Sequence, residues 1–247
     1  MARSLKARVA AGEQLLGVLL RMPAEETVEM VGVAGLDFVV IDAEHGPADV
    51  TVLRQHVALA ELHQLAVVVR VGSGEPSLVL RALDAGAQGV VAPHVDNAEQ
   101  AAALVDSAHY PPLGHRGFAT YGRTGRFGTV AAADHLAHQT AATLVIAMIE
   151  SPQAVANTAD ILAVPGIDGY FIGPADLRAA SGPGDPSLED AVLRVHAAAA
   201  DTAALRLELV SSPTDARRAL AGGAQLVAYN LTHVWMDMLR ALRLPQS

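Results

Sequence analysis

Three titratable side chains follow an apolar run in the segment FVVIDAEHGP, residues 38–47. Asp42, Glu44 and His45 come directly after a pattern that is typical of a fully buried strand. A carboxylate can hold a cation, and an imidazole that titrates near neutral pH can carry a proton. The segment therefore indicates acid–base chemistry at the end of a strand.

Three further apolar runs also end in polar or turn-forming residues. Arg70 ends LAVVVR, Glu150 ends TLVIAMIE, and Gly173, Pro174 and Asp176 follow GYFI. Two carboxylates without a cysteine or a histidine cluster favour a hard divalent cation such as Mg²⁺ or Mn²⁺. We therefore expect Glu150 and Asp176 to contribute to a metal site.

A bound cation with open positions suits the chemistry of 2-oxo acids. It can bind the keto and carboxylate oxygens, polarise the carbonyl and stabilise an enolate. Arg70 would add positive charge at the same oxygen, and His45 would transfer the proton. No lysine ends a strand, which disfavours a Schiff-base route.

The elements that must position these residues are eight short apolar runs that alternate with segments of helical period. The predicted strands are 15–20, 37–42, 65–70, 89–95, 143–150, 169–174, 205–210 and 225–231. Continuous apolar strands indicate a parallel sheet that helices cover on both faces. The pattern predicts one (β/α)8 TIM barrel over residues 1–247, whose strand ends meet at one rim. An open doubly wound sheet is the alternative, but no G-x-G-x-x-G follows the first strand.

Composition restricts the classes of function. The chain has 17 Lys and Arg against 26 Asp and Glu, a net charge of −9 and no cysteine. Without a dense basic stripe, it is not expected to bind nucleic acid or an anionic membrane. No stretch reaches the roughly 18 apolar residues of a membrane span. We expect a cytoplasmic protein.

Several polar residues have competing interpretations. Glu150 and Asp176 could instead cap the helices that follow them. His94, at the end of a strand, could contact substrate or have a packing role. Arg116 and Arg123, with Arg126, lie in the long insert 111–128 and could guide an anionic substrate or bridge subunits.

The residues carry a resemblance to a known family. The segments IDAEHGP, VVVRV, LDAGAQGVVAPHVDNAEQA, YPPLGHRG and GIDGYFIGPADL, with Glu150, resemble the HpcH/HpaI aldolases, which are metal-dependent pyruvate aldolases. The resemblance spans nearly the whole chain. It implies a barrel that cleaves or forms 4-hydroxy-2-oxo acids through a pyruvate enolate. It also implies a homohexamer, or trimer of dimers, whose last helix is exchanged between neighbours.

The resemblance also implies roles for single residues. Glu150 and Asp176 would hold a divalent metal ion, Mg²⁺, Mn²⁺ or Co²⁺. His45 would be the acid–base group, and Asp42 and Asp84 match acidic positions around it. Arg70 would stabilise the enolate. The expected contacts of the 2-oxo acid are Arg70, Gly173, Pro174, Ala175, Asp176 and Leu209.

Three positions depart from the family pattern. Met148 stands where a Gln is usual, Arg178 where a Ser is usual, and the eighth strand ends in Tyr229-Asn230-Leu231-Thr232. These departures keep a second enzyme hypothesis open, in which the enolate condenses with an oxo acid or a CoA ester, as in citrate synthesis. A barrel that binds a 2-oxo acid without turnover is the third hypothesis.

Overall fold

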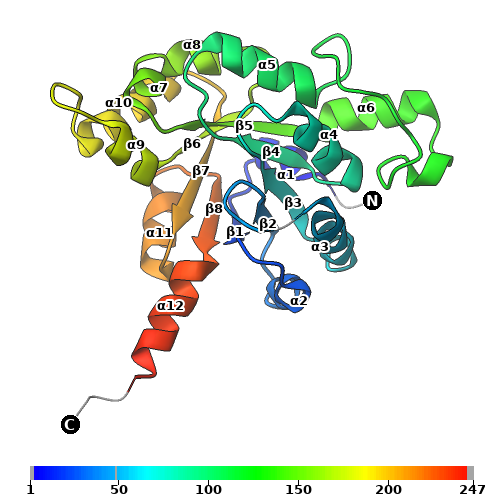
Figure 1. The fold of residues 1–247 in the computed structure, drawn as a ribbon, viewed down its shortest axis with the longest axis horizontal. Coiled ribbons are helices and arrows are strands. Elements are labelled where there is room, and N and C mark those ends of the chain that lie inside the picture. The colour runs from blue at the N-terminus through cyan, green and yellow to red at the C-terminus, as the bar shows by residue number, and fades with distance from the viewer. Residues whose placement is uncertain (1–2, 48, 244–247) are drawn as a thin grey trace.

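The computed structural model describes residues 3–47 and 49–243. Eight parallel strands pair in chain order, and β1 pairs with β8 to close the barrel (Figure 1). The strands β1 to β8 are Leu15–Leu20, Phe38–Asp42, Ala66–Arg70, Gly89–Ala92, Leu144–Ile149, Gly169–Ile172, Leu205–Val210 and Leu226–Asn230. The predicted TIM barrel is confirmed, and the doubly wound sheet is wrong.

Helices cover the outside of the barrel. The helices α1 to α8 are Leu5–Ala10, Glu25–Val33, Val50–Leu62, Pro76–Ala85, Ala98–Ala108, Ala132–Ala142, Pro152–Ala156 and Thr158–Leu162. The helices α9 to α12 are Pro174–Ala180, Leu188–Ala199, Pro213–Ala221 and Leu231–Ala241, and a 3₁₀ turn, η1, covers Arg126–Gly128. The last helix, α12, projects away from the barrel in Figure 1, and none of its residues is buried.

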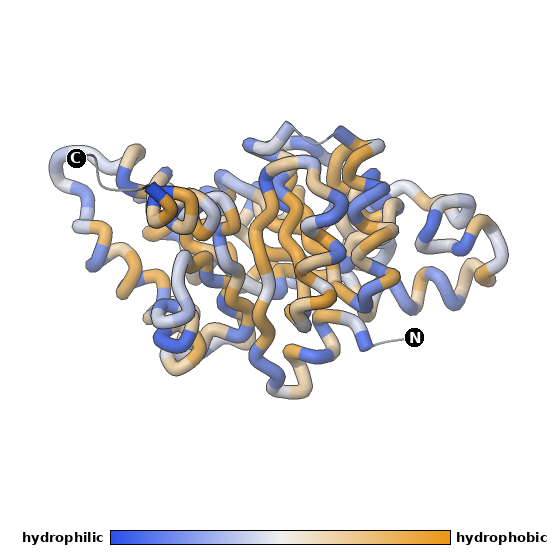
Figure 2. Tube along the Cα trace, turned by 90° about the horizontal axis from the view of Figure 1, so that it is seen from below, coloured by the Kyte–Doolittle hydropathy of each residue, from blue (hydrophilic) through white to orange (hydrophobic). Residues whose placement is uncertain are grey.

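Two apolar layers hold the strands in place. The inner layer fills the barrel with alternate strand residues, among them Phe38, Val68 and Ile146. The outer layer lies between the strands and the helices and includes Val39, Val67 and Val145. Figure 2 shows the hydrophobic segments concentrated in the middle of the molecule. Burial on both faces explains why the strands are continuous rather than alternating in hydropathy.

The short helix α1 was not predicted. It begins at Ser4, whose hydroxyl accepts a hydrogen bond from the Ala7 N–H at 3.2 Å. Leu5 and Val9 are four residues apart, so they lie on one face of the helix. Both are buried in the inner layer with Leu15 and Leu144, which begin β1 and β5. The helix therefore closes the amino-terminal end of the barrel.

Polar side chains begin several helices at the opposite, carboxyl-terminal end. Asp49 accepts hydrogen bonds from the N–H groups of Thr51 and Val52, both at 2.9 Å, and so caps α3. Asn97 caps α5 in the same way, by accepting from the Gln100 N–H at 2.9 Å. Such caps satisfy N–H groups that lack a partner within the helix, and they fix where each strand–helix connection ends.

The long insert lies away from the carboxyl-terminal rim. Two arginines of this insert form ion pairs with helices of the barrel. Arg123 pairs with Glu61, and Arg116 Nη2 lies 2.6 Å from Asp84 Oδ1. Glu61 and Asp84 belong to the last turns of α3 and α4, which lead into the starts of β3 and β4. The insert therefore contacts the amino-terminal end of the barrel.

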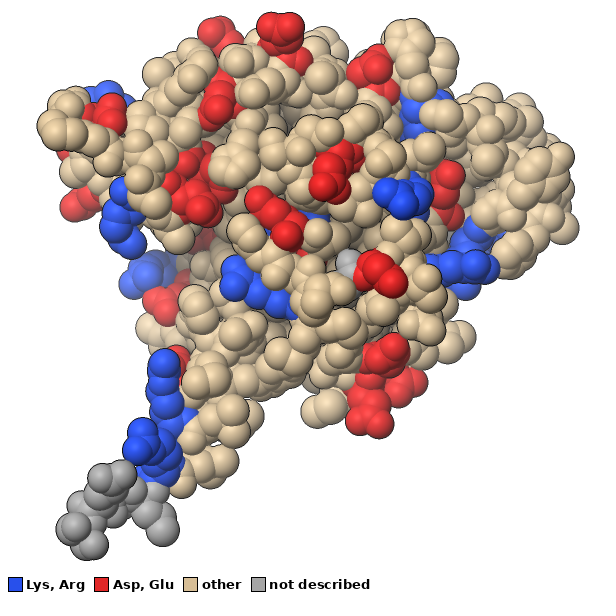
Figure 3. All heavy atoms as spheres, viewed as in Figure 1, with Lys and Arg blue, Asp and Glu red and all other residues tan. Residues whose placement is uncertain are grey.

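Acidic and basic side chains are interspersed on the surface. In Figure 3, basic side chains are scattered among acidic ones on the face shown. No helix among the described residues combines the length and apolar character that crossing a lipid bilayer requires.

Candidate active site

A buried ion pair joins the ends of β2 and β3. Asp42 and Arg70 are register partners in the parallel ladder, so their side chains start at the same level of the barrel. Asp42 accepts hydrogen bonds from Arg70 Nε at 2.9 Å and Nη2 at 2.5 Å. Asp42 is 0% exposed and Arg70 is 5% exposed. This bidentate geometry fixes the guanidinium in one orientation.

The pair determines the charge state of both groups. Burial alone would raise the pKa of Asp42, but the hydrogen bonds and charge of Arg70 bring it below its ordinary value. Burial would lower the pKa of Arg70, but its bonds to Asp42 and the charge of Glu44 keep it above its ordinary value. Both groups are therefore ionised at neutral pH.

The turn after β2 places the predicted acid–base residue. Asp42 Oδ1 accepts hydrogen bonds from the N–H groups of Glu44 and His45, both at 3.2 Å. The His45 side chain is 52% exposed, and its Nε2 lies 3.7 Å from Glu44 Oε2. Asp42 thus anchors both Arg70 and the turn that carries the imidazole, which leaves the imidazole open to the mouth of the barrel.

Glu44 is more enclosed than its sequence position suggested. Its Oε2 is buried and forms no hydrogen bond within the described residues. The same atom lies 3.3 Å from Arg70 Nε. Glu44 therefore contributes a third, incompletely satisfied carboxylate to the rim.

Glu150 follows β5 and faces inward at the rim. Its side chain is 2% exposed, and its Oε1 accepts a hydrogen bond from the His94 N–H at 2.7 Å. His94 Nδ1 lies 3.3 Å from the same oxygen. The next helix is capped by Ser151, whose hydroxyl accepts from the Ala154 N–H. Glu150 therefore does not cap that helix, and the capping interpretation is wrong.

Asp176 reaches the same rim from the first turn of α9. Gly173 is the N-cap residue of this helix and no side chain caps it, so Asp176 is not a cap either. A Cβ atom on Gly173 would lie 2.5 Å from Glu150 Oε2, which shows how closely the end of β6 approaches Glu150. Pro174 and Ala175 lie between this contact and Asp176, and both are exposed with it.

Charge repulsion marks this side of the rim. Burial raises the pKa of the Glu150 carboxyl above its ordinary value, whereas its contacts with His94 oppose the rise. The negative charges of Asp176 and Glu44 raise this pKa further. Two further carboxylates therefore act on Glu150, which has no Lys or Arg side chain within ion-pair distance among the described residues.

This donor set fits a divalent metal ion. Mg²⁺ is commonly held by one or two carboxylates, with water or substrate oxygens in its other positions. Glu150 and Asp176 supply two carboxylates, and a cation between them would relieve the repulsion. No three His, Asp or Glu side chains form a preformed metal cage within residues 3–47 and 49–243. The arrangement fits an open site rather than a closed structural one.

Comparison with known proteins identifies the family. The HpcH/HpaI aldolase/citrate lyase family matches residues 17–234 of the 247-residue chain. The chain belongs to this family. It is an enzyme of the carbon–carbon lyase class.

Named relatives cover most of the chain. It is 37% identical over 227 residues to a 5-keto-4-deoxy-D-glucarate aldolase from Klebsiella pneumoniae subsp. pneumoniae, which covers 90% of this chain and 88% of that protein. It is 39% identical over 210 residues to a pyruvate aldolase from Rhizobium etli, which covers 84% and 80%. A solved HpcH/HpaI aldolase/citrate lyase family structure from Burkholderia cenocepacia J2315 is 32% identical, covers 96% of both chains and has a TM-score of 0.87.

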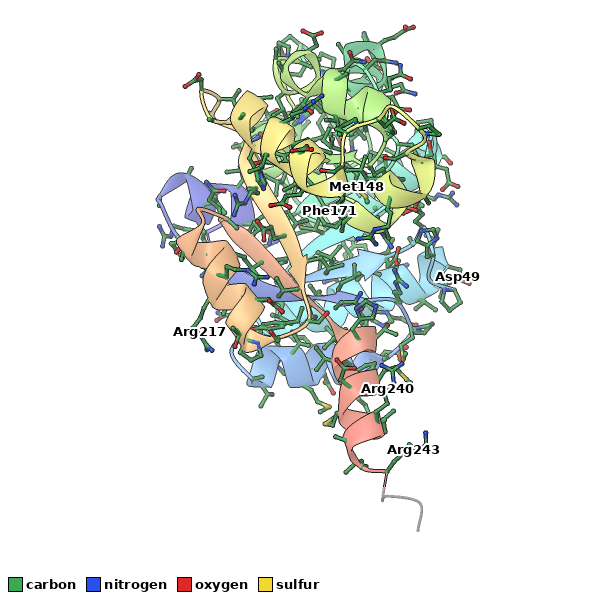
Figure 4. The ribbon with its side chains drawn as sticks, turned by 90° about the vertical axis from the view of Figure 1, so that its left-hand side faces the viewer. Asp49, Met148, Phe171, Arg217, Arg240 and Arg243 are labelled. Atoms are coloured by element: carbon green, nitrogen blue, oxygen red, sulfur yellow. The ribbon has the colours of Figure 1, made fainter. Side chains whose placement is uncertain are left out.

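The floor of this HpcH/HpaI site is apolar. Met148 and Phe171 are register partners on β5 and β6, and Figure 4 shows them close together inside the barrel. Met148 is 1% exposed and Phe171 is 8% exposed. Leu209 on β7 packs against the same inner layer. With Arg70 and Phe171 it lines a cavity of about 10 Å³. Met148 and Leu209 therefore lie directly beneath the charged rim.

Some predicted residues of this family member lie apart from the cluster. Asp84 is in the last turn of α4 and accepts a hydrogen bond from Arg116, at the amino-terminal end of the barrel. The structure therefore does not bring Asp84 to His45 within one chain. The three arginines of the insert also lie at that end, so they do not line this chain's own site.

The departures from the family pattern have different positions. Asn230 ends β8 and caps α12 by accepting a hydrogen bond from the His233 N–H at 3.4 Å. Leu231 and Thr232 begin that helix, and Arg178 is an exposed residue of α9. Only Met148 is part of the packed floor.

One residue of the rim was missed. Arg21 follows β1, and its Nε lies 3.1 Å from Asp42 Oδ2. The sequence carries the same signal here as at Arg70, since an apolar run, LLGVLL, ends directly before an arginine.

Proposed function

We propose that the chain is a metal-dependent lyase that cleaves or forms the carbon–carbon bond of a 4-hydroxy-2-oxo acid through a pyruvate-type enolate. The observation that carries this proposal is that a cluster of carboxylates and an oriented guanidinium lie at the same rim of the barrel. Excess carboxylates lie at the ends of β5 and β6, and a fixed guanidinium lies at the end of β3. The names of the aldolase relatives support the same reaction class.

Glu150 and Asp176 would hold the metal ion, Mg²⁺, Mn²⁺ or Co²⁺. When bound, such an ion polarises a keto group and stabilises the charge of an enolate. The His94 N–H donates to Glu150 Oε1, and Gly173 leaves room for Oε2, which a Cβ at that position would approach to 2.5 Å. These contacts orient the carboxylate before any ligand arrives.

Arg70 would stabilise the enolate oxygen. Its Nε and Nη2 are occupied by Asp42, whereas Nη1 forms no hydrogen bond within the described residues. A cation that is already oriented stabilises developing negative charge without reorganisation during the reaction. Asp42 thus acts through Arg70 and through the main chain of His45.

His45 would transfer the proton. In the direction of cleavage, its imidazole removes the proton of the C4 hydroxyl group, and the C3–C4 bond breaks. The electron pair of that bond passes to C3 and the 2-oxo oxygen, which forms the enolate and releases an aldehyde. Protonation at C3 then gives pyruvate. An imidazole nitrogen can accept this proton and return it, which is the usual role of a histidine in general acid–base catalysis.

The 2-oxo acid would lie between these groups and the apolar floor. The contacts with the acid would come from the start of α9, where Gly173 is the N-cap residue and Pro174, Ala175 and Asp176 form the first turn. The main-chain N–H groups of Ala175 and Asp176 lack acceptors within the helix and can bind a carboxylate. Leu209 would contact the methyl or methylene end from β7.

We also infer that the chain acts as a homo-oligomer, with a hexamer as the expected form. The helix α12 leaves the barrel, and its side chains Met236, Met238 and Leu239 are exposed. Large exposed apolar side chains on one helix are typical of a protein interface.

Two assays test the proposed chemistry. Pyruvate release from 4-hydroxy-2-oxo acids should occur in Mg²⁺, Mn²⁺ or Co²⁺ and stop in EDTA. Deuterium should also enter the methyl group of pyruvate in D₂O, because enolisation exposes that carbon to solvent protons. Full activity in EDTA would exclude the metal, and the absence of exchange with metal present would exclude the enolate.

A further inference from the structure

Arg21 is a second guanidinium at the rim that the chemistry above does not use. It follows β1, and its side chain is 38% exposed, whereas its neighbour Asp42 is fully buried. Its Nε lies 3.1 Å from Asp42 Oδ2 but is not aligned for a hydrogen bond. Asp42 already accepts two hydrogen bonds from Arg70. Arg21 adds its charge to that of Arg70 beside Asp42, but the side-chain hydrogen bonds to Asp42 come from Arg70.

The side chain of Arg21 donates no hydrogen bond within the described residues, and its Nε is buried although the side chain as a whole is partly exposed. A guanidinium has five N–H donors in a planar arrangement that matches a carboxylate. Among residues 3–47 and 49–243, only Asp42 provides a carboxylate within ion-pair distance of Arg21, and no group accepts a hydrogen bond from its side chain. A partly exposed cation with free donors is suited to bind an anion.

The main chain holds Arg21 beside the turn that carries His45. A Cβ atom on Gly46 would lie 2.4 Å from the Arg21 carbonyl oxygen and 2.2 Å from that of Asp42. Only glycine permits this approach, so the segment 42–46 packs directly on the end of β1. Arg21 therefore lies on the His45 side of the rim.

The position of β1 in the barrel separates Arg21 from the carboxylate side. The strands are arranged in chain order, so β1 lies opposite β5, where Glu150 is placed. A 2-oxo acid held near Glu150 and Asp176 would extend its far end towards His45 and Arg21. That far end is the part that leaves as the aldehyde.

We propose that Arg21 is a specificity-determining residue that binds a carboxylate on the aldehyde portion, so that the preferred substrates are 2-oxo diacids. This inference rests on the proposed aldol chemistry. Arg21 takes no part in breaking the bond, and it places the C4 hydroxyl group of such a substrate next to His45.

The experiment compares aldehydes in the direction of synthesis. Wild type, Arg21→Met, Arg21→Lys and the control Arg217→Met are assayed with pyruvate and metal. Arg217 is an exposed residue of α11, away from the rim (Figure 4). Two pairs of acceptors serve as probes, namely glyoxylate with glycolaldehyde and 4-oxobutanoate with pentanal. Deuterium exchange into pyruvate is measured without an acceptor.

Loss of a charge-assisted hydrogen bond should be specific to the anionic aldehydes. For Arg21→Met we expect kcat/KM to fall about 10- to 100-fold with an anionic acceptor. It should change less than about twofold with the neutral partner, as should deuterium exchange. Arg21→Lys should restore part of the preference, because it keeps the charge but not the planar arrangement. Arg217→Met should behave as wild type.

Different results would overturn different claims. Equal losses with anionic and neutral aldehydes, or no loss with either pair, would overturn the role of Arg21 while exchange in the wild type still supported the enolate. Absence of exchange in the metal-loaded wild type would overturn the proposed function and, with it, this inference.

Discussion

The two sides of the rim differ in charge balance, because one holds a neutralised ion pair and the other holds carboxylates of like charge. At the ends of β2 and β3, Asp42 and Arg70 neutralise each other through two hydrogen bonds in a buried pair. At the ends of β5 and β6, burial raises the pKa of Glu150, and the like charge of Asp176 raises it further. A paired side can be rigid without a ligand, whereas an unpaired side is stabilised by what it binds. The difference suggests that one side positions the reacting groups and the other receives the cation.

Of the variants considered, removal of the Glu150 carboxylate should have the largest effect on activity. For Glu150→Gln we expect activity to fall about 10³-fold or more, because one of the two carboxylates that we propose as metal ligands is lost. The thermal midpoint of the metal-free protein should stay the same or rise, because a buried, repelled charge has been removed. Added Mn²⁺ should raise the midpoint of the wild type but not that of the variant, by ligand linkage.

A matched control for this variant is Glu99→Gln, at an exposed position of α5. Its midpoint should rise with Mn²⁺ as the wild type does. An equal rise in Glu150→Gln, measured by calorimetry, would contradict the metal assignment.

Removal of Asp42 should have the opposite effect on stability. Asp42→Asn leaves the buried charge of Arg70 without its main partner, so we expect a loss of about 3 to 5 kcal/mol at neutral pH. The folded-state pKa of Asp42 is lowered, so its contribution is present above the unfolded pKa of about 3.9 and is lost as pH falls through the folded value. The gap between wild type and variant should therefore shrink in acid.

Urea unfolding between pH 7 and pH 3 measures that gap. The control is Asp237→Asn, which removes an exposed ion pair with Arg240 and should have little effect at any pH. A gap for Asp42→Asn that is constant with pH would mean that the ion pair does not determine the stability of this side.

A smaller effect is expected at the junction between β6 and Glu150. Gly173→Ala would place a methyl group 2.5 Å from Glu150 Oε2, so the carboxylate must shift. We expect a stability loss of about 1 to 3 kcal/mol, and weaker metal binding by titration calorimetry. In Gly182→Ala the nearest atom would lie 3.8 Å away, so this variant should bind metal normally. Unchanged metal affinity in Gly173→Ala would show that the position of Glu150 is not critical.

The sequence was a good guide to the barrel because burial leaves a simple pattern. The bounds of the predicted strands 15–20 and 205–210 agree with β1 and β7, and the other predicted strands differ from the observed ones by one to three residues at their ends. Helix α1 was missed because it is only six residues long, although Ser4, Leu5 and Val9 already carried the cap and the spacing of a short helix.

The site was predictable where a polar residue ends an apolar run. Asp42, Arg70 and Glu150 follow this rule, and Arg21 would have been found by applying it to the first strand as well. Asp84 could not be placed in this way, because it lies within a helix and the sequence alone does not show which end of the barrel it faces. The enclosure of Glu44 depends on the turn after β2, which no periodic pattern describes.

The main-chain bond between His94 and Glu150 has a consequence for variation within this fold. His94 has a φ of +54°, a conformation that is costly for a residue with a side chain, and it aims its N–H at Glu150 Oε1. Because the backbone makes this bond, the side chain at position 94 can be exchanged while the bond is kept. An exchange of this side chain would remove the contact of His94 Nδ1 with Glu150 Oε1 but keep the main-chain hydrogen bond that orients the carboxylate, and Asn or Gly would also relax the strain.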